Sequence, residues 1–350
     1  MENKRGIPDF FGIEGATPSL SEWQEIREKI KKLFLDTEYG NLPKRIEPKI
    51  RVESNYIDFA GKAVWEDVFF KFENDGKSHE VKAELILPKG KKNVPVFVYI
   101  SFAKETPSKY MPLEEIIDNG FGVFSFCYEN VTSDNDDFSD GLCGLFEGDF
   151  GKISIWSYMA IACMDYLQER DEVDKDNIAI CGHSRLGKTA LLTSALDDRF
   201  KLTCSNDSGC CGASVSRGKV EGNETLMEIT RVFPFWFTKE FLRYRENPDE
   251  LPFDQHLLLS LIAPRYLVIG TANEDFWADN AGQLLACQLS SFAWKIYGKD
   301  GLIENAKFDA VCEMLDGELC FYQRNGTHFL SRSDWQMYMK KFKEIINVQK

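Results

Sequence analysis

Short apolar runs alternate along the chain with longer segments of mixed character, and the two kinds of segment carry different periodicities. Runs rich in β-branched and aromatic residues predict strands. The predicted strands are, in chain order, 80–87, 94–101, 120–128, 178–180, 201–206, 265–271 and 318–323. Apolar positions at helical spacing predict helices over 21–34, 189–196, 281–297 and after Ser333, with Ser21 as the cap of the first. Strands that alternate with helices predict an α/β fold with a mostly parallel central sheet flanked by helices.

The same pattern divides the chain into parts. Residues 1–75 are predicted to form an N-terminal extension, largely helical, that packs on the main domain. Residues 76–350 are predicted to form that main, catalytic domain. Within it, 211–262 becomes irregular and aromatic, with the segment Phe233-Pro-Phe-Trp-Phe237. We expect this stretch to be a pocket or lid insertion after the sixth strand of the sheet.

The segment Gly182-His-Ser-Arg-Leu-Gly-Lys-Thr189 joins a predicted buried strand to a predicted helix. A serine at such an elbow is pushed out of the sheet beside the first amides of a helix, which suits a nucleophile. The same letters match the phosphate-binding loop pattern Gly-x-x-x-x-Gly-Lys-Thr. A phosphate loop usually follows the first strand of its domain, whereas strong strand candidates precede this elbow. The context therefore favours Ser184 as the nucleophile of an α/β-hydrolase fold, with nucleotide binding as the alternative.

A serine nucleophile needs a base, and the sequence has four histidines. His79 lies in a charged stretch and is expected to be solvated. His183 adjoins Ser184, so its side chain is expected to leave the opposite side of the turn. His256 lies near the start of a probable core helix, where a structural hydrogen bond is the simpler role. His328 lies in a loop after the last predicted strand, where a hydrolase places its base.

The acid that orients the base has two possible positions. Asp207 directly follows the strand after the elbow helix, in Asn206-Asp-Ser-Gly209, which could equally be a turn held by side-chain hydrogen bonds. Glu274 and Asp275 follow the next strand, where most α/β-hydrolases carry their acid. The pattern alone favours Asp275.

Charge and cysteine content limit the binding partners and the cellular compartment that the sequence predicts. The formal net charge of −14, from 42 basic and 56 acidic residues, argues against a nucleic-acid groove or an anionic membrane surface as partner. The ten cysteines are scattered, with no C-x-x-C pair, which is typical of free thiols in a reducing cytosol rather than of disulfides or a zinc site. The amino terminus has basic residues but no apolar stretch after them, so no signal peptide is predicted. We expect a cytoplasmic protein, or a secreted one if a leader was removed, and no metal or other cofactor.

The motifs together resemble those of the glucuronoyl esterases, carbohydrate esterase family 15, from about residue 80 to the end. The segments that carry the resemblance are Gly182-x-Ser-Arg-x-Gly-Lys188, Asp207-Ser-Gly209, Ile262-Ala-Pro-Arg265, Trp277-Ala-Asp279 and His328. Arginine directly after the nucleophile, with Gly-Lys two positions later, is unusual among serine hydrolases. The resemblance implies cleavage of esters between a 4-O-methyl-glucuronic acid branch of xylan and an alcohol, typically of lignin.

The resemblance also implies roles for individual residues. Ser184 would be the nucleophile, His328 the base and Asp207 the acid. Arg185 would stabilise the oxyanion, a role that suits a permanently charged guanidinium. The residues implied to hold the uronate sugar are Lys188, Glu224, Trp277 and, as a weaker candidate, Gln255. With these roles, Asp207→Asn is expected to cost more activity than Asp275→Asn.

Some positions depart from the family. Many members have glutamate where Asp207 stands, and the shorter side chain leaves Glu274 or Asp275 as an assisting acid. His183 replaces a cysteine of the fungal branch, so the disulfide of that branch is absent. Members that act on lignocellulose are exported, whereas this sequence shows no leader. A cytosolic relative would act on imported uronyl oligosaccharide esters or on another carbohydrate ester, such as an acetylated sugar.

Overall fold

A computed structural model describes residues 5–12 and 18–348 of the chain. The first four residues, on which the expectation of no signal peptide partly depends, lie outside the described residues. A sheet of ten strands forms the centre, in the order β1-β2-β3-β5-β4-β6-β7-β8-β10-β9. Its strands are β1 (Lys49–Asp58), β2 (Ala63–Asn74), β3 (Lys77–Pro88), β4 (Val94–Ser101), β5 (Gly122–Cys127), β6 (Val173–His183), β7 (Leu202–Asn206), β8 (Tyr266–Ala272), β9 (Cys312–Met314) and β10 (Leu319–Arg324). The six strands in the middle of this order, β5-β4-β6-β7-β8-β10, pair in parallel. At the two edges β1, β2 and β3 on one side and β9 on the other pair antiparallel to their neighbours.

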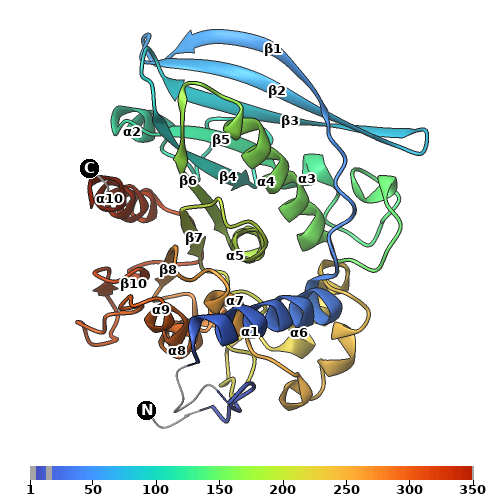
Figure 1. Cartoon of the computed structure of the whole chain (residues 1–350), viewed down its shortest axis with the longest axis vertical. Coiled ribbons are helices and arrows are strands. Elements are labelled where there is room, and N and C mark those ends of the chain that lie inside the picture. Colours follow the sequence, from blue (N-terminus) through green and yellow to red (C-terminus); the bar gives the residue numbers. More distant parts are fainter. Residues whose placement is uncertain (1–4, 13–17, 349–350) are drawn as a thin grey trace.

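Helices lie on both faces of the sheet. They are α1 (Leu20–Leu33), α2 (Leu113–Asp118), α3 (Tyr128–Val131), α4 (Lys152–Gln168), α5 (Arg185–Leu196), α6 (Leu226–Val232), α7 (Gln255–Ser260), α8 (Asn280–Ser290), α9 (Phe292–Ile296) and α10 (Arg332–Val348). Short π or 3-10 turns are η1 (Phe34–Tyr39), η2 (Cys143–Leu145), η3 (Pro234–Trp236), η4 (Phe241–Tyr244), η5 (Pro248–Glu250) and η6 (Phe276–Ala278). Figure 1 shows α2 and α10 on one side of the sheet and α4 and α5 on the other.

The two faces follow from the alternation of side chains along the strands. In β6, Ile178 and Ile180 belong to the larger core cluster, which includes residues of α4 and α5. Ala179 and Cys181 belong to the second cluster, with residues of α2 and α10. The prediction of an α/β-hydrolase fold with a mostly parallel sheet is confirmed.

The amino-terminal part of the chain contributes more than a helix. Residues before 75 provide α1, η1 and the strands β1 and β2; β1 pairs with β2, and β2 pairs with β3 in the same sheet. The predicted cap of α1 is wrong: Ser19, not Ser21, accepts the Glu22 amide, and the Glu22 carboxylate accepts the Ser19 amide in return. Ser21 lies inside the helix because the capping box places the cap three residues before an acidic partner.

The irregular segment 211–262 lies between β7 and β8, where it forms α6, η3, η4, η5 and α7. It follows the seventh strand rather than the sixth, since β1 and β2 add two strands to the five that the apolar pattern predicts before it. Among the described residues, no helix is both long and apolar enough to span a membrane.

Candidate active site

Ser184 stands at a sharp turn between β6 and α5. Its backbone has φ 57° and ψ −124°, outside the regions that non-glycine residues ordinarily adopt. The turn is tight: a Cβ on Gly182 would lie 2.0 Å from the Leu186 carbonyl oxygen. Helix α5 begins at Arg185, directly after the serine. This is the geometry of a nucleophile elbow, which exposes the hydroxyl beside the first amides of a helix.

His328 lies in the loop that leads from β10 to α10. Its Nδ1 is 2.5 Å from Oδ2 of Asp275, which follows β8. Asp275 is 6% exposed and His328 is exposed, so one ring nitrogen faces the carboxylate of a buried aspartate. An imidazole held in this way at Nδ1 presents Nε2 as a proton acceptor.

Asp207 lies beside this pair without replacing Asp275. One oxygen of Asp207, one of Asp275 and one ring nitrogen of His328 lie within 4.8 Å of one another. Oδ1 of Asp207 accepts the Ala272 amide at 3.0 Å, and Oδ2 is 3.7 Å from the Arg324 guanidinium. Burial and the neighbouring Asp275 charge hold the pKa of Asp207 well above its usual range. The hydrogen bond to the histidine, which the resemblance implies for Asp207, is made by Asp275. Glu274, the other candidate acid, is exposed, and its amide donates to the Gly326 carbonyl.

His183 does not point away from the site, and that expectation is wrong. Its ring lies 4.5 Å from the ring of His328, centroid to centroid, and its Nδ1 is 2.7 Å from Oδ1 of Asn206. The reason is that β6 stays extended through His183, so this side chain shares a face with Cys181, the face on which α10 packs. Burial and the nearby His328 lower the pKa of His183 to about 3. The contact also places His328 next to the residue that precedes Ser184.

The Arg185 side chain is fixed by an acid and by aromatic rings. Its Nη1 donates to Asp134, whose carboxylate also accepts the Trp236 indole N–H at 2.7 Å. The guanidinium carbon lies 4.6 Å from the ring centroid of Trp236 and 4.9 Å from that of Phe233. Sequence reasoning found Arg185 and the aromatic segment 233–237 but did not connect them, because the contact needs the folded positions of both.

Two of the proposed sugar-binding residues are buried. Lys188 is 4% exposed and donates to the Ser208 carbonyl. Gln255 is fully buried, and its Nε2 lies 2.8 Å from an oxygen of Glu38 in η1. Burial raises the pKa of Glu38 to about 8, although the Gln255 hydrogen bond and the Lys188 charge act in the opposite direction. Sequence reasoning did not identify Glu38, because it lies in the segment taken to be an extension.

The other two proposed sugar-binding residues lie on adjacent loops. The Glu224 amide donates to the Trp277 carbonyl at 2.9 Å, and the Trp277 side chain is 48% exposed. Asp279 anchors this turn by accepting hydrogen bonds from Arg5 and Lys219. Burial alone would raise the pKa of Asp279, but these two cations outweigh it and hold the pKa well below its usual range.

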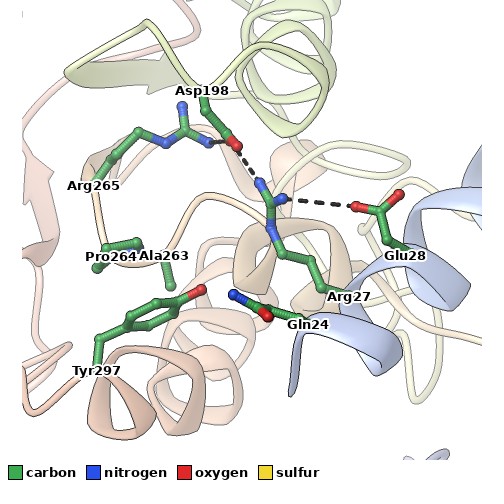
Figure 2. A pocket seen from close by; sticks show the side chains of 8 residues that line it. All are labelled: Gln24, Arg27, Glu28, Asp198, Ala263, Pro264, Arg265 and Tyr297. Carbon is green, nitrogen blue, oxygen red and sulfur yellow. Dashed lines mark hydrogen bonds and ion pairs between the residues drawn. The ribbon is translucent and has the colours of Figure 1, made fainter. Parts of the chain in front are cut away.

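The Ile262-Ala-Pro-Arg265 motif lies at the other end of β8, away from Ser184. Arg265 donates to the carbonyl oxygens of Ser194 and Phe200 and to Asp198. Arg27 of α1 donates to the same Asp198 at 2.6 Å. Figure 2 shows both arginines directed at Asp198 in a pocket of about 410 Å³. This motif therefore joins α1 to the sheet and contributes nothing to the chemistry at the elbow.

The trio Asp207, Asp275 and His328 has the side-chain types of a metal site. A contact of 2.5 Å between His328 and Asp275 is a charge-assisted hydrogen bond, too short for two ligands of one metal ion. A phosphate loop also fits poorly, because the Leu186 carbonyl occupies the inside of the turn and Lys188 is directed at Ser208. The arrangement is suited to a serine nucleophile, a histidine base and an orienting acid.

Comparisons with known proteins identify the family. A family profile described as "Glucuronyl esterase, fungi" matches residues 70–298. Carbohydrate esterase MZ0003, from an unknown prokaryotic organism, is 35% identical over 237 residues, which are 65% of this chain and 54% of that protein. The 4-O-methyl-glucuronoyl methylesterase of Schizophyllum commune is 26% identical over 339 residues, 89% of this chain and 80% of that protein. The match thus spans about half the length of the first relative and most of the second.

Solved structures extend the likeness to the whole fold. The glucuronoyl esterase from Solibacter usitatus is 28% identical with a TM-score of 0.85, over 93% of this chain and 94% of that one. A promiscuous esterase of carbohydrate esterase family 15 from the marine bacterial metagenome is 27% identical with a TM-score of 0.85, over 97% and 96% of the two chains.

Proposed function

The chain belongs to the glucuronoyl esterase family of carboxylic ester hydrolases, and from this we propose that it hydrolyses esters of uronic acids, with Ser184 as the nucleophile. The observation that carries the proposal is the elbow at Ser184 beside the His328–Asp275 pair. The names of its relatives support a 4-O-methyl-glucuronoyl ester as the substrate.

The proposed reaction is a two-step acyl transfer. His328 takes the proton of the Ser184 hydroxyl while the oxygen attacks the ester carbonyl carbon. The carbonyl oxygen becomes an oxyanion, which Arg185 and the first amides of α5 stabilise. The C–O bond to the alcohol then breaks, and the alcohol leaves with the proton from His328. Water, deprotonated by the same histidine, releases the uronate from the serine.

We propose Asp275 as the acid that orients His328, because it makes the hydrogen bond to Nδ1. Asp207 is then a neighbour of this pair and not the orienting acid, and its raised pKa favours the protonated form. Trp277, with its half-exposed ring, and Glu224 are proposed to contact the sugar. Lys188 and Gln255 are proposed as the buried wall of the sugar pocket. In support, Oε1 of Gln255 is a buried acceptor that finds no hydrogen-bond partner within the described ranges, a group that calls for an explanation.

The cytosolic setting stays a prediction. All ten cysteines are buried and free, which supports a reducing compartment but does not identify one.

A panel of esters tests the proposed function. We expect benzyl and methyl glucuronate to be hydrolysed with a kcat/KM at least about tenfold above that for an acetylated sugar. Ser184→Ala should lower kcat on the glucuronates by about a thousandfold or more. Hydrolysis of the acetylated sugar alone would make the protein an acetyl-sugar esterase. Glucuronate binding without turnover of any ester would make it a binding protein of the same fold.

A further inference from the structure

Asp134 is a nearly buried carboxylate that faces the elbow from a distant part of the chain. It lies in the loop between α3 and η2, 51 positions before Arg185, and its side chain is 9% exposed. Three donors converge on it: Nη1 of Arg185, Nε1 of Trp236 at 2.7 Å and the hydroxyl of Tyr128 at 3.2 Å. A buried carboxylate with three donors, one of them charged, has a fixed position.

Rings of the insertion hold the other side of the guanidinium. Phe233 and Trp236 stack with centroids 4.0 Å apart and planes at 3°, and both lie within 5 Å of the guanidinium carbon. Phe102, directly after β4, lies 5.8 Å away. Trp236 therefore contacts the arginine twice, through its ring and through Asp134. Such cation–π contacts favour one orientation of a guanidinium.

Two nitrogens of this guanidinium, Nε and Nη2, make no hydrogen bond with a residue that the structure describes. Nε of Arg185 is buried and finds no hydrogen-bond partner among the residues that the structure describes. A buried N–H without an acceptor lowers the stability of a protein, so such a group calls for an explanation. Asp134 engages Nη1 only, and the rings restrict rotation, so Nη2 of this partly exposed side chain keeps N–H groups available next to the nucleophile.

We propose that Asp134 is a positioning residue of the oxyanion hole: together with Trp236 it holds Arg185 so that a free N–H of the guanidinium donates to the oxyanion formed on attack by Ser184. The proposal rests on the proposed function of Ser184 as an ester nucleophile. Asp134 acts through Arg185 alone and touches no reacting atom. Preorganisation of this kind contributes to kcat, because the oxyanion exists in the transition state and not in the bound ester.

Asp134→Asn tests the proposal, because it removes the charge that holds Nη1 and keeps the volume of the side chain. We expect kcat on benzyl glucuronate to fall about ten- to a hundredfold, with KM changed less than about twofold. The matched control is Asp136→Asn, which removes the same charge from an exposed position of the same loop and should leave both constants unchanged.

A double-mutant cycle separates positioning from a structural role. In an Arg185→Ala background, Asp134→Asn should lower kcat by less than about twofold, since the residue through which it acts is gone. An equal loss in both backgrounds, or a single variant with wild-type kcat, would overturn the proposal. If Asp134→Asn lowers the melting temperature strongly, Trp236→Phe serves instead: it keeps an aromatic side chain beside Arg185 and removes the indole donor to Asp134. It should lower kcat in the wild-type background and not in the Arg185→Ala background.

The rate of phosphonylation by a fluorophosphonate distinguishes a failure of the proposed function from a failure of the proposed role of Asp134. It reports on Ser184 and its oxyanion donors without any uronate substrate. A wild-type chain that is labelled but does not hydrolyse glucuronate esters contradicts the proposed function alone. A labelling rate that Asp134→Asn leaves unchanged contradicts the role of Asp134 alone.

Discussion

The imidazole of His328 lies beside two buried carboxyl groups, and their surroundings differ. Asp275 contacts Nδ1 at 2.5 Å. Asp207 binds the Ala272 amide with one oxygen and faces Arg324 with the other. Burial and the Asp275 charge favour the protonated form of Asp207. Because Asp275 makes the hydrogen bond to Nδ1, it is the carboxyl group placed to stabilise the imidazolium that forms when the serine is deprotonated.

Exchanging each acid for its amide tests this assignment. Asp275→Asn should lower kcat on benzyl glucuronate by about 10² to 10⁴, because the amide cannot hold the imidazolium and favours the wrong tautomer. Asp207→Asn should lower kcat less than about tenfold, because Asp207 binds the Ala272 amide and Nδ1 of His328 is held by Asp275. This ranking reverses the one that the family resemblance implied. Steady-state kinetics on both variants decide it, and a larger loss for Asp207→Asn would return the role of acid to the family position.

Among single residues, the sequence predicts those whose proposed roles depend on local geometry. Ser184 follows from its place between strand and helix, and His328 from chain order. The pattern alone favours Asp275 as the acid, and only the resemblance favours Asp207. The position of His183 and the partner of Arg185 depend on distances between strand ends and loops far apart in sequence. No periodicity encodes those distances.

Helix α1 shows what a local signal contributes to an element. Its capping box pairs the Ser19 hydroxyl with the Glu22 amide and the Glu22 carboxylate with the Ser19 amide. Trp23 and Ile30 are fully buried, and Arg27 reaches Asp198 (Figure 2). The cap fixes where the helix starts, and therefore which residues face the core.

Replacing either of two serines near the start of α1 is expected to change the stability by different amounts. Ser19→Ala should lower the free energy of unfolding by about 1 kcal/mol, because it removes the acceptor for the Glu22 amide. Ser21→Ala should change it by less than about 0.5 kcal/mol, since alanine is a good helix former at an interior position. Urea denaturation of both variants measures the difference. Equal losses would show that the box contributes nothing to stability.

Helices and strands whose apolar residues recur at a regular spacing can be predicted from the sequence, and those without such a spacing cannot. The apolar runs at 94–101 and 201–206 correspond to β4 and β7 within one residue. The helix predicted over 281–297 is two helices, α8 and α9. Helix α4 was not predicted, because nearly its whole circumference is buried and its apolar residues form no stripe. Strands β1 and β2 mix charged and apolar residues, so they read as part of an extension.

Glu38 connects three parts of the molecule at one buried point. Its carbonyl accepts the Thr238 amide of the insertion, and its carboxyl group accepts from Gln255 at the start of α7. Lys188 of α5 and Asp254 act on it electrostatically. Figure 1 shows α1, α6 and α7 gathered at the same end of the molecule. The amino-terminal segment is therefore joined to the insertion and to α5 at a buried point of the core.

The pH dependence of stability tests this connection. Burial raises the pKa of Glu38 from 4.5 to about 8. Between these values the folded protein keeps a proton that the unfolded chain has lost, so stability falls as the pH rises, by up to about 1.4 kcal/mol per unit. Glu38→Gln should remove this component between pH 5 and 8, and the exposed Glu47→Gln should keep it. Urea denaturation across this pH range measures the slopes. Equal slopes for Glu38→Gln and wild type would contradict a raised pKa.

The class of fold follows from the order of strands and helices along the sequence. The contacts between strand ends and loops do not follow from that order. Chain order places Ser184 after one strand and His328 after the last, and parallel strands bring such ends to one edge of the sheet. The pairing of Glu38 with Gln255, 217 positions apart, has no counterpart in the sequence pattern. Long-range contacts between irregular segments need the coordinates.

The central claim is that Ser184 is an ester nucleophile in a glucuronate pocket. Peptide mapping after reaction with a fluorophosphonate, with and without excess glucuronate, tests it most directly. The account predicts one adduct per chain, on Ser184, loss of benzyl glucuronate hydrolysis in proportion to labelling, and slower labelling in the presence of glucuronate. An adduct on another residue, or full hydrolysis by a fully labelled protein, would contradict it.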